Sequence, residues 1–272
     1  MKPIIIRTIT GSIFVALVIF SILAGHFFFA GLFILIGLLG IFEFYRIISN
    51  ESSSPQKLNG VITAAIFYIT VILYHYGLIT KSFLLFNIIT SAAMFIYELY
   101  RKKAQPFTNL ACTYLGIIYI ITPLLLLNMM FQTGNTSNSF NPHILLGFFI
   151  IIWTSDTFAY LAGMAFGKHK LFERISPKKT WEGSIGGAIA GIIAALVLSF
   201  FFNEYKLLTW VAIAIIIIVF GTLGDLAESL LKRTYNIKDS GSILPGHGGI
   251  LDRIDGVLIA APILYIFINL IK

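Results

Sequence analysis

The sequence predicts an all-α integral membrane protein, a polytopic bundle of about nine transmembrane helices. Hydrophobic residues make up 58% of the 272-residue chain and charged residues only 11%, and the mean hydropathy is +0.91. Soluble domains carry about 25% charged residues. The apolar residues gather in runs of about 20, the length that a helix needs to cross a bilayer. The single cysteine, Cys112, lies inside such a run, which excludes intramolecular disulfides and disfavours a thiolate metal site.

Nine apolar runs of this kind can be placed along the chain. They cover residues 8–24, 27–45, 58–79, 82–99, 108–131, 143–164, 183–202, 207–230 and 250–271. Only Gly25 and His26 separate the first two runs, so a merged or broken segment there would change the number of spans. The basic start and the first run are similar to a signal peptide. The run continues into the second without a small-residue cleavage site, however, which indicates an uncleaved anchor.

Lysine and arginine are distributed unevenly between the two sides of this nine-span arrangement. Sixteen of the 19 cations fall on one side, and only Lys81, Lys206 and Lys272 fall on the other. Because cations are retained in cytoplasmic loops, we expect a multi-pass protein of the cell (inner, cytoplasmic) membrane with a cytoplasmic N-terminus. The net charge of +7 then suits anionic lipid and nucleotide phosphates at one membrane face. We expect no nucleic acid partner, because no basic and aromatic module for one is present.

The two halves of the chain differ in their polar chemistry. Nine of the twelve acidic residues fall in the second half. We therefore expect residues 1–131 to form a scaffold of N-terminal transmembrane helices with a candidate interface. Residues 132–272 are expected to form a catalytic transmembrane region with a polar site that faces the cytoplasm.

Two acidic residues of the first half lie near span ends with a cation three residues later. They are Glu43, followed by Arg46, and Glu98, followed by Arg101. The i, i+3 spacing brings such side chains together, and the cation cancels much of the cost of burying the carboxylate. We interpret both as ion pairs at helix ends.

Asp156 sits well inside the sixth apolar run. A carboxylate at that depth costs a few kcal/mol and usually faces a cavity or a partner, so we name it as a candidate substrate contact. Tyr160 lies on the same helical face, and a structural hydrogen bond to it or to a neighbouring helix is the alternative.

The loop at residues 167–183 carries five cations, which could simply follow the retention of cations in the cytoplasm. Its Ser-Pro and Thr-x-Glu-Gly sequences are, however, helix-start signals. They would set several polar residues at a helix N-terminus suited to an anion. These candidate substrate-binding residues are Ser176, Lys178, Lys179 and Thr180. Lys168 and Lys170 are interpreted as surface charge.

Small residues recur at four-residue spacing along the seventh run. They are Gly183, Gly187, Gly191 and Ala195. Small residues on one face let helix backbones approach closely. This face is expected to pack within the bundle or to form the interface of a homodimer.

The eighth run ends in polar residues that share one helical face. They are Asp225, Glu228, Ser229 and Lys232, at positions i, i+3, i+4 and i+7. An amphipathic helix end at the membrane surface would give the same pattern. The sequence that follows favours a functional interpretation.

Residues 229–255 combine four cations, three carboxylates, one histidine and four glycines in an otherwise apolar chain. The charged residues flank the turn Pro245-Gly246-His247-Gly248-Gly249. Turns of this kind can direct backbone N–H groups at phosphate where a helix begins. The composition indicates phosphate and metal chemistry at a membrane surface.

The fixed positions of this stretch are Ser229, Lys232-Arg233, Lys238-Asp239, Leu244-Pro245, His247-Gly248-Gly249 and Asp252-Arg253-x-Asp255. This pattern resembles the signature of the phosphatidate cytidylyltransferase (CDP-diacylglycerol synthase) family. The string Ser-Pro-Lys-Lys-Thr-Trp-Glu-Gly at residues 176–183 is similar to a second segment of the same family. The resemblance implies that CTP and phosphatidate, a membrane lipid, give CDP-diacylglycerol and pyrophosphate.

Candidate roles follow from this chemistry and from the resemblance. The catalytic candidates are Asp225, Lys232, Arg233, Lys238, Asp239, His247, Asp252, Arg253 and Asp255, and Ser229, Gly248 and Gly249 join the substrate-binding candidates. His247 could shuttle a proton, bind phosphate or make a structural hydrogen bond.

Magnesium is the expected cofactor, with one or two ions, because it prefers carboxylate and phosphate oxygens. The expected ligands are Asp225, Asp252 and Asp255, with Asp239 and Asp156 as further candidates. Zinc is disfavoured, because no set of Cys or His ligands is present. The short polar link between the last two spans should bring Asp225 and Asp252 to one membrane face and into one metal site.

Two other functions compete with this one. Acids embedded in the membrane and segments interrupted by glycine are also features of cation-coupled transporters. Transporters often show paired halves, whereas the polar residues here lie almost entirely in one half. Another CTP-dependent lipid enzyme is the second alternative, which the complete signature disfavours.

Overall fold

The computed structural model describes residues 3–132, 141–243 and 248–271, and it divides into two compact units. Unit 1 contains residues 1–129 and 237–253, and unit 2 contains residues 130–236 and 254–272. The expected division at residue 131 lies close to the first of these boundaries. The signature segment, however, is divided between the units: residues 237–243 and 248–253 belong to unit 1 with the N-terminal helices.

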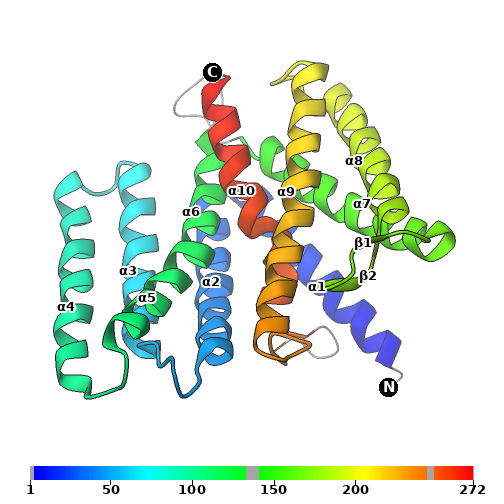
Figure 1. Ribbon diagram of the computed structural model, residues 1–272. Helices are drawn as coiled ribbons and strands as arrows, with labels where there is room; N and C mark the ends of the chain where they lie inside the picture. The colour runs from blue at the N-terminus through cyan, green and yellow to red at the C-terminus, as the bar shows by residue number, and fades with distance from the viewer. Residues whose placement is uncertain (1–2, 133–140, 244–247, 272) are drawn as a thin grey trace. The chain divides into compact units, whose positions relative to one another are not determined.

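Unit 1 is built from helices that follow one another along the chain (Figure 1). They are α1 (Pro3–Ala24), α2 (His26–Ile48), α3 (Lys57–His75), η1 (Lys81–Leu85), α4 (Phe86–Arg101), α5 (Pro106–Gly116), η2 (Ile117–Ile121) and α6 (Thr122–Met129). The break expected at the first span boundary is present, since Gly25 has φ +120°, a backbone conformation that favours glycine. A π-helical turn, η2, joins α5 to α6.

The core of unit 1 forms where α2 packs against α3, α5 and η2. Tyr45 on α2 is fully buried and donates a hydrogen bond of 2.6 Å to the carbonyl of Thr113. Gly60 and Gly116 lie against its ring, and a Cβ at Gly116 would come within 2.6 Å of it. Glycine at these two positions lets the helices close around the tyrosine.

Unit 2 contains η3 (Met130–Gln132), α7 (His143–Phe166), β1 (Lys170–Phe172), β2 (Ser176–Thr180), α8 (Trp181–Phe201), α9 (Leu207–Thr234) and all but the first turn of α10 (Leu251–Leu270). Helices α7 and α8 form the most extensive helix pair. The small-residue stripe is confirmed as a packing face within the bundle. A Cβ at Gly183 would lie 2.7 Å from the carbonyl oxygen of Ala159, and a Cβ at Gly187 would lie 2.6 Å from that of Ser155.

Seven segments in the described part of the chain are long and apolar enough to cross a membrane, so this is a membrane protein. They run from α2 to α9, with η1–α4 and α5–α6 each counted as one span. The predicted number of nine is not confirmed. The apolar part of α1, Thr8–Ala24, is shorter, and α10 carries Asp252, Arg253 and Asp255 near its start.

The expected helix start at Ser176 is wrong. Residues 176–180 form strand β2, which pairs antiparallel with β1, with Lys170 opposite Thr180 and Phe172 opposite Ser176. Ser-Pro is compatible with this, since the residue before proline favours extended backbone. Helix α8 begins after Thr180, whose hydroxyl accepts a hydrogen bond of 3.2 Å from the Gly183 N–H and caps the helix.

The close approach of α7 and α8 predicts a specific sensitivity to one added carbon. Gly187→Ala should lower the stability of the protein by about 1 to 3 kcal/mol, because the new methyl group meets a backbone carbonyl that cannot easily move. Val197→Ile adds one carbon at a side chain that is 49% exposed, and it should be neutral. Thermal unfolding of the purified variants in detergent would compare them. Equal unfolding temperatures would contradict the packing assignment.

Candidate functional site

Carboxylates from three helices of unit 2 interact with one another. Asp255 on α10 interacts electrostatically with Asp225 and Glu228 on α9, and with Asp156 on α7. Asp156 in turn interacts with Asp225 and with the ammonium of Lys179. Like charges gathered in this way raise one another's energy unless cations or protons accompany them. Of the acids named from the sequence, Asp156, Asp225 and Asp255 are thus close enough to interact, and their roles stay predictions.

Lys179, from strand β2, forms an ion pair with Asp225 of this group. Its Nζ lies 2.5 Å from Oδ2 of Asp225, and the Ser229 hydroxyl donates to the other carboxylate oxygen at 3.3 Å. Successive strand residues point to opposite faces, so Lys178 is exposed while Lys179 reaches α9. The hairpin thus separates two lysines that the sequence analysis treated alike.

Close packing of α9 on α10 brings Asp225 near Asp255. A Cβ on Gly224 would collide with the backbone carbonyl of Asp255 and lie 3.1 Å from Cα of Gly256. The carboxylate of Asp255 accepts a hydrogen bond of 2.8 Å from the Gly256 N–H. Gly224, the residue before Asp225, must therefore be glycine for α9 and α10 to approach each other this closely at the acidic group.

The end of α9 adds two cations with different partners. Lys232 forms an i, i+4 ion pair with Glu228, whose side chain is fully buried. Arg233 donates through Nε to the carbonyl of Ile175 at 3.2 Å, which fixes the end of α9 against the hairpin. An ion pair holds Lys232 in place, whereas Arg233 is exposed and keeps further donors for a ligand.

In unit 1, Asp252 organises the described part of the glycine-rich turn. Its Oδ2 accepts hydrogen bonds from the Gly249 N–H at 2.8 Å, the Ser240 N–H at 3.0 Å and the Ser240 hydroxyl at 2.9 Å. Gly248 has φ +84°, and a Cβ there would lie 2.6 Å from the same oxygen. The role of Asp252 in this geometry is to fold the turn around its carboxylate.

Glu43 on α2, which is buried, holds the same turn. Its Oε2 accepts from the Leu251 N–H at 3.1 Å, where α10 begins, and from the Ser240 hydroxyl at 3.3 Å. The predicted partner was Arg46, and that interpretation is wrong. Sequence reasoning missed the role of Glu43 in holding the turn, because its partners lie about 200 residues away in the sequence. The only signal in the sequence was a carboxylate inside an apolar run.

The remaining predicted residues are as follows. Lys238, Asp239 and Arg253 are exposed in unit 1, and Ser176 is half-buried on β2. His247 lies outside the described residues. Asp225 and Asp252 belong to different units, so their shared metal site stays a prediction. Among the residues that the structure describes, no three His, Cys, Asp or Glu side chains are placed to hold a metal ion.

Comparison with known proteins identifies the family of the chain. Residues 5–271 match the Cytidylyltransferase family. This chain belongs to that family. The cytidylyltransferase is 38% identical over 194 residues to a protein named phosphatidate cytidylyltransferase from Staphylococcus haemolyticus, a match that covers 71% of this chain and 68% of the relative.

Two further relatives with the same printed name extend the similarity. The Staphylococcus aureus protein is 32% identical over 240 residues, which are 87% of this cytidylyltransferase and 89% of the relative. The Rickettsia bellii protein is 40% identical over 169 residues, which are 60% of this chain and 71% of the relative. The similarity therefore includes the N-terminal helices as well as the signature.

The contacts of Glu43 lead to a testable prediction about the turn. Glu43→Leu should leave the buried Leu251 N–H without an acceptor, which costs about 1 to 3 kcal/mol, and should speed hydrogen exchange at Ser240 and Leu251. Glu43→Gln keeps an acceptor oxygen and should change exchange much less. Hydrogen-exchange mass spectrometry of the purified protein would measure both. Unchanged exchange in the leucine variant would contradict the assignment.

Proposed function

We propose that this cytidylyltransferase transfers CMP from CTP to phosphatidate, forming CDP-diacylglycerol and pyrophosphate. The observation that carries the proposal is the acidic group of unit 2, with Lys179 paired to Asp225, in a chain that belongs to the Cytidylyltransferase family. A membrane-embedded protein suits this reaction, because the acyl chains of the lipid remain in the bilayer while its headgroup meets a water-soluble nucleotide.

The reaction needs no nucleophile from the protein. A phosphate oxygen of phosphatidate attacks the α-phosphorus of CTP, a new P–O bond forms, and the bond to the β-phosphate oxygen breaks with its electron pair leaving on pyrophosphate. The protein must bring two polyanions together and stabilise the charge on the leaving group. Lys179, Lys232 and Arg233 supply positive charge for this beside the acidic group.

Magnesium is proposed as the cofactor, and the donors of unit 2 suit it. Carboxylates gathered from α7, α9 and α10 are the ligand type that Mg²⁺ prefers. Asp225 and Asp255 would hold the ion, with Asp252 as a further candidate. When bound, it would neutralise charge on the phosphates of CTP. Lys179 supplies positive charge of the protein's own next to Asp225.

Loss of the carboxylate charge at Asp225 should abolish turnover. Asp225→Asn keeps the shape of the side chain but removes the charge that pairs with Lys179, and we expect a loss of at least about 100-fold in kcat, the effect of removing one preorganised electrostatic group. Glu51→Gln, an exposed position in the loop after α2, serves as the control. Pyrophosphate release from CTP and phosphatidate measures both variants, and near-normal turnover by Asp225→Asn would rule out the proposed role.

The same assay tests the metal and the two alternative functions. Full chelation of divalent ions should stop pyrophosphate release, and added Mg²⁺ should restore it; robust turnover after chelation would contradict the metal proposal. A lipid panel in place of phosphatidate would identify another CTP-dependent lipid enzyme. A cation-coupled transporter would release no pyrophosphate from any lipid.

The uneven distribution of cations supports a cytoplasmic N-terminus in the cell membrane, with the signature on the cytoplasmic side. In a background without Cys112, a cysteine introduced at Asn138 should react with an impermeant reagent added to intact cells. Asn138 lies outside the described residues, and exposed Lys178 provides the matched position on the cytoplasmic side. A cysteine at Lys178 should react only after the membrane is opened. The reverse labelling pattern would overturn this orientation.

A homodimer remains part of the proposal. The glycine stripe of α8 is occupied by α7, so a second copy of the chain would have to bind through another surface.

A further inference from the structure

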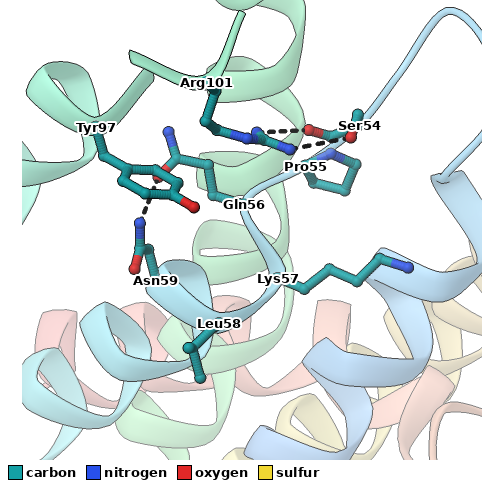
Figure 2. A pocket seen from close by; sticks show the side chains of 8 residues that line it. All are labelled: Ser54, Pro55, Gln56, Lys57, Leu58, Asn59, Tyr97 and Arg101. Atoms are coloured by element: carbon teal, nitrogen blue, oxygen red, sulfur yellow. Dashed lines mark hydrogen bonds between the residues drawn. The ribbon is translucent and has the colours of Figure 1, made fainter. Parts of the chain in front are cut away.

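A polar cavity lies in unit 1, and none of the residues assigned to the reaction is among the described residues that line it. It has a volume of about 280 Å³ and is lined by the start of α3 and the end of α4 (Figure 2). We call it the α3–α4 pocket. Its walls include the cations Lys57 and Arg101, the amide side chains of Gln56 and Asn59, and the ring of Tyr97. The sequence analysis interpreted Arg101 only as half of an ion pair.

Arg101 is held rigidly in the wall of the pocket. Its guanidinium donates to Oε2 of Glu98 at 2.9 Å, confirming the predicted pair, and to the carbonyl and hydroxyl of Ser54 at 2.8 and 3.0 Å (Figure 2). Glu98 is only 5% exposed and also accepts hydrogen bonds from Gln56 and Asn109. The carboxylate of Glu98 therefore has three hydrogen-bond partners, and Glu98 is not among the residues that line the pocket.

The other wall of the α3–α4 pocket offers hydrogen-bond donors and positive charge, and no acidic side chain is among the described residues that line the pocket. Lys57 is exposed at the first position of α3, and no side chain caps this helix. The N–H groups of a helix's first turn have no partner within the helix, and those of Leu58 and Asn59 belong to this turn. Together with Lys57 they give the pocket a positive potential that suits an anion.

The position of the pocket indicates a ligand from the membrane. Lys57 begins one candidate span and Arg101 ends the next, so the pocket lies at the edge of the apolar zone. The span that ends at Arg101 is only 11% buried within the protein. Beside the polar wall, Leu58 is 72% exposed and Tyr97 is 50% exposed. A ligand with a charged head and apolar chains would satisfy both surfaces.

The apolar surface beside the polar wall favours a lipid over a soluble phosphate compound, and a cavity of about 280 Å³ has room for a phosphate group. We propose that the α3–α4 pocket binds the phosphate of an anionic glycerophospholipid, whose acyl chains lie along the exposed faces of α3 and α4.

Native mass spectrometry of the full-length protein, with phosphatidylglycerol and phosphatidylcholine as probes, tests the proposal. Lys57→Gln should weaken phosphatidylglycerol binding about fivefold, the contribution of one cation near an anionic lipid, and Lys57→Glu should weaken it further. Lys103→Gln removes a nearby exposed lysine that does not line the pocket, and it should bind like the wild type. Arg101 is left intact, because its loss would leave Glu98 buried without its cation.

Equal binding of phosphatidylglycerol by Lys57→Glu and the wild type would overturn the proposal. So would a loss in Lys103→Gln as large as in Lys57→Gln, since the effect would then be general surface charge. Displacement of the lipid by millimolar inorganic phosphate, without any preference for phosphatidylglycerol over phosphatidylcholine, would assign the pocket to a soluble anion and reject the lipid. Thermal stabilisation by phosphatidylglycerol that is lost in Lys57→Glu gives an independent measurement of binding.

Discussion

The ion pair between Lys179 and Asp225 is the contact on which the polar part of unit 2 depends. It joins the β1–β2 hairpin to α9, and α9 in turn carries its acids toward α7 and α10. Carboxylates in an apolar bundle are costly unless a cation or a ligand shares their charge. The carboxylates of unit 2 therefore cost free energy to bury, and they attract cations for the same reason. A reaction between two polyanions requires such cations.

The helices could be predicted because their signals are local. Runs of apolar residues located, to within a few residues, the seven segments in the described part of the chain that are long and apolar enough to cross a membrane. Gly25 marked the break between α1 and α2. The hairpin could not be predicted in this way. Ser176 and Pro177 are compatible with a helix start or with a strand, and only pairing with β1 selects the strand.

The site was predictable in residue type but not in geometry. The spacing on α9 placed Asp225 and Ser229 on one face, and they are hydrogen-bonded. Spacing gives no information on contacts between distant segments, such as Lys179 with Asp225 or Glu43 with Leu251. Glu43 illustrates the reason: its nearest cation in sequence was the simplest partner, yet a turn about 200 residues later provides the hydrogen bonds.

The π turn η2 sets the alignment of the two helices that it joins. A π turn winds one more residue than an α turn, so removal of a single residue from Ile117–Ile121 would leave a continuous α-helix but rotate everything after it by about 100°. Asn128, which now donates to the carbonyl of His26 and accepts from the Tyr76 hydroxyl, would turn away from both. In the evolution of this chain, η2 is therefore a place where a one-residue deletion preserves the helix and destroys the fit between helices.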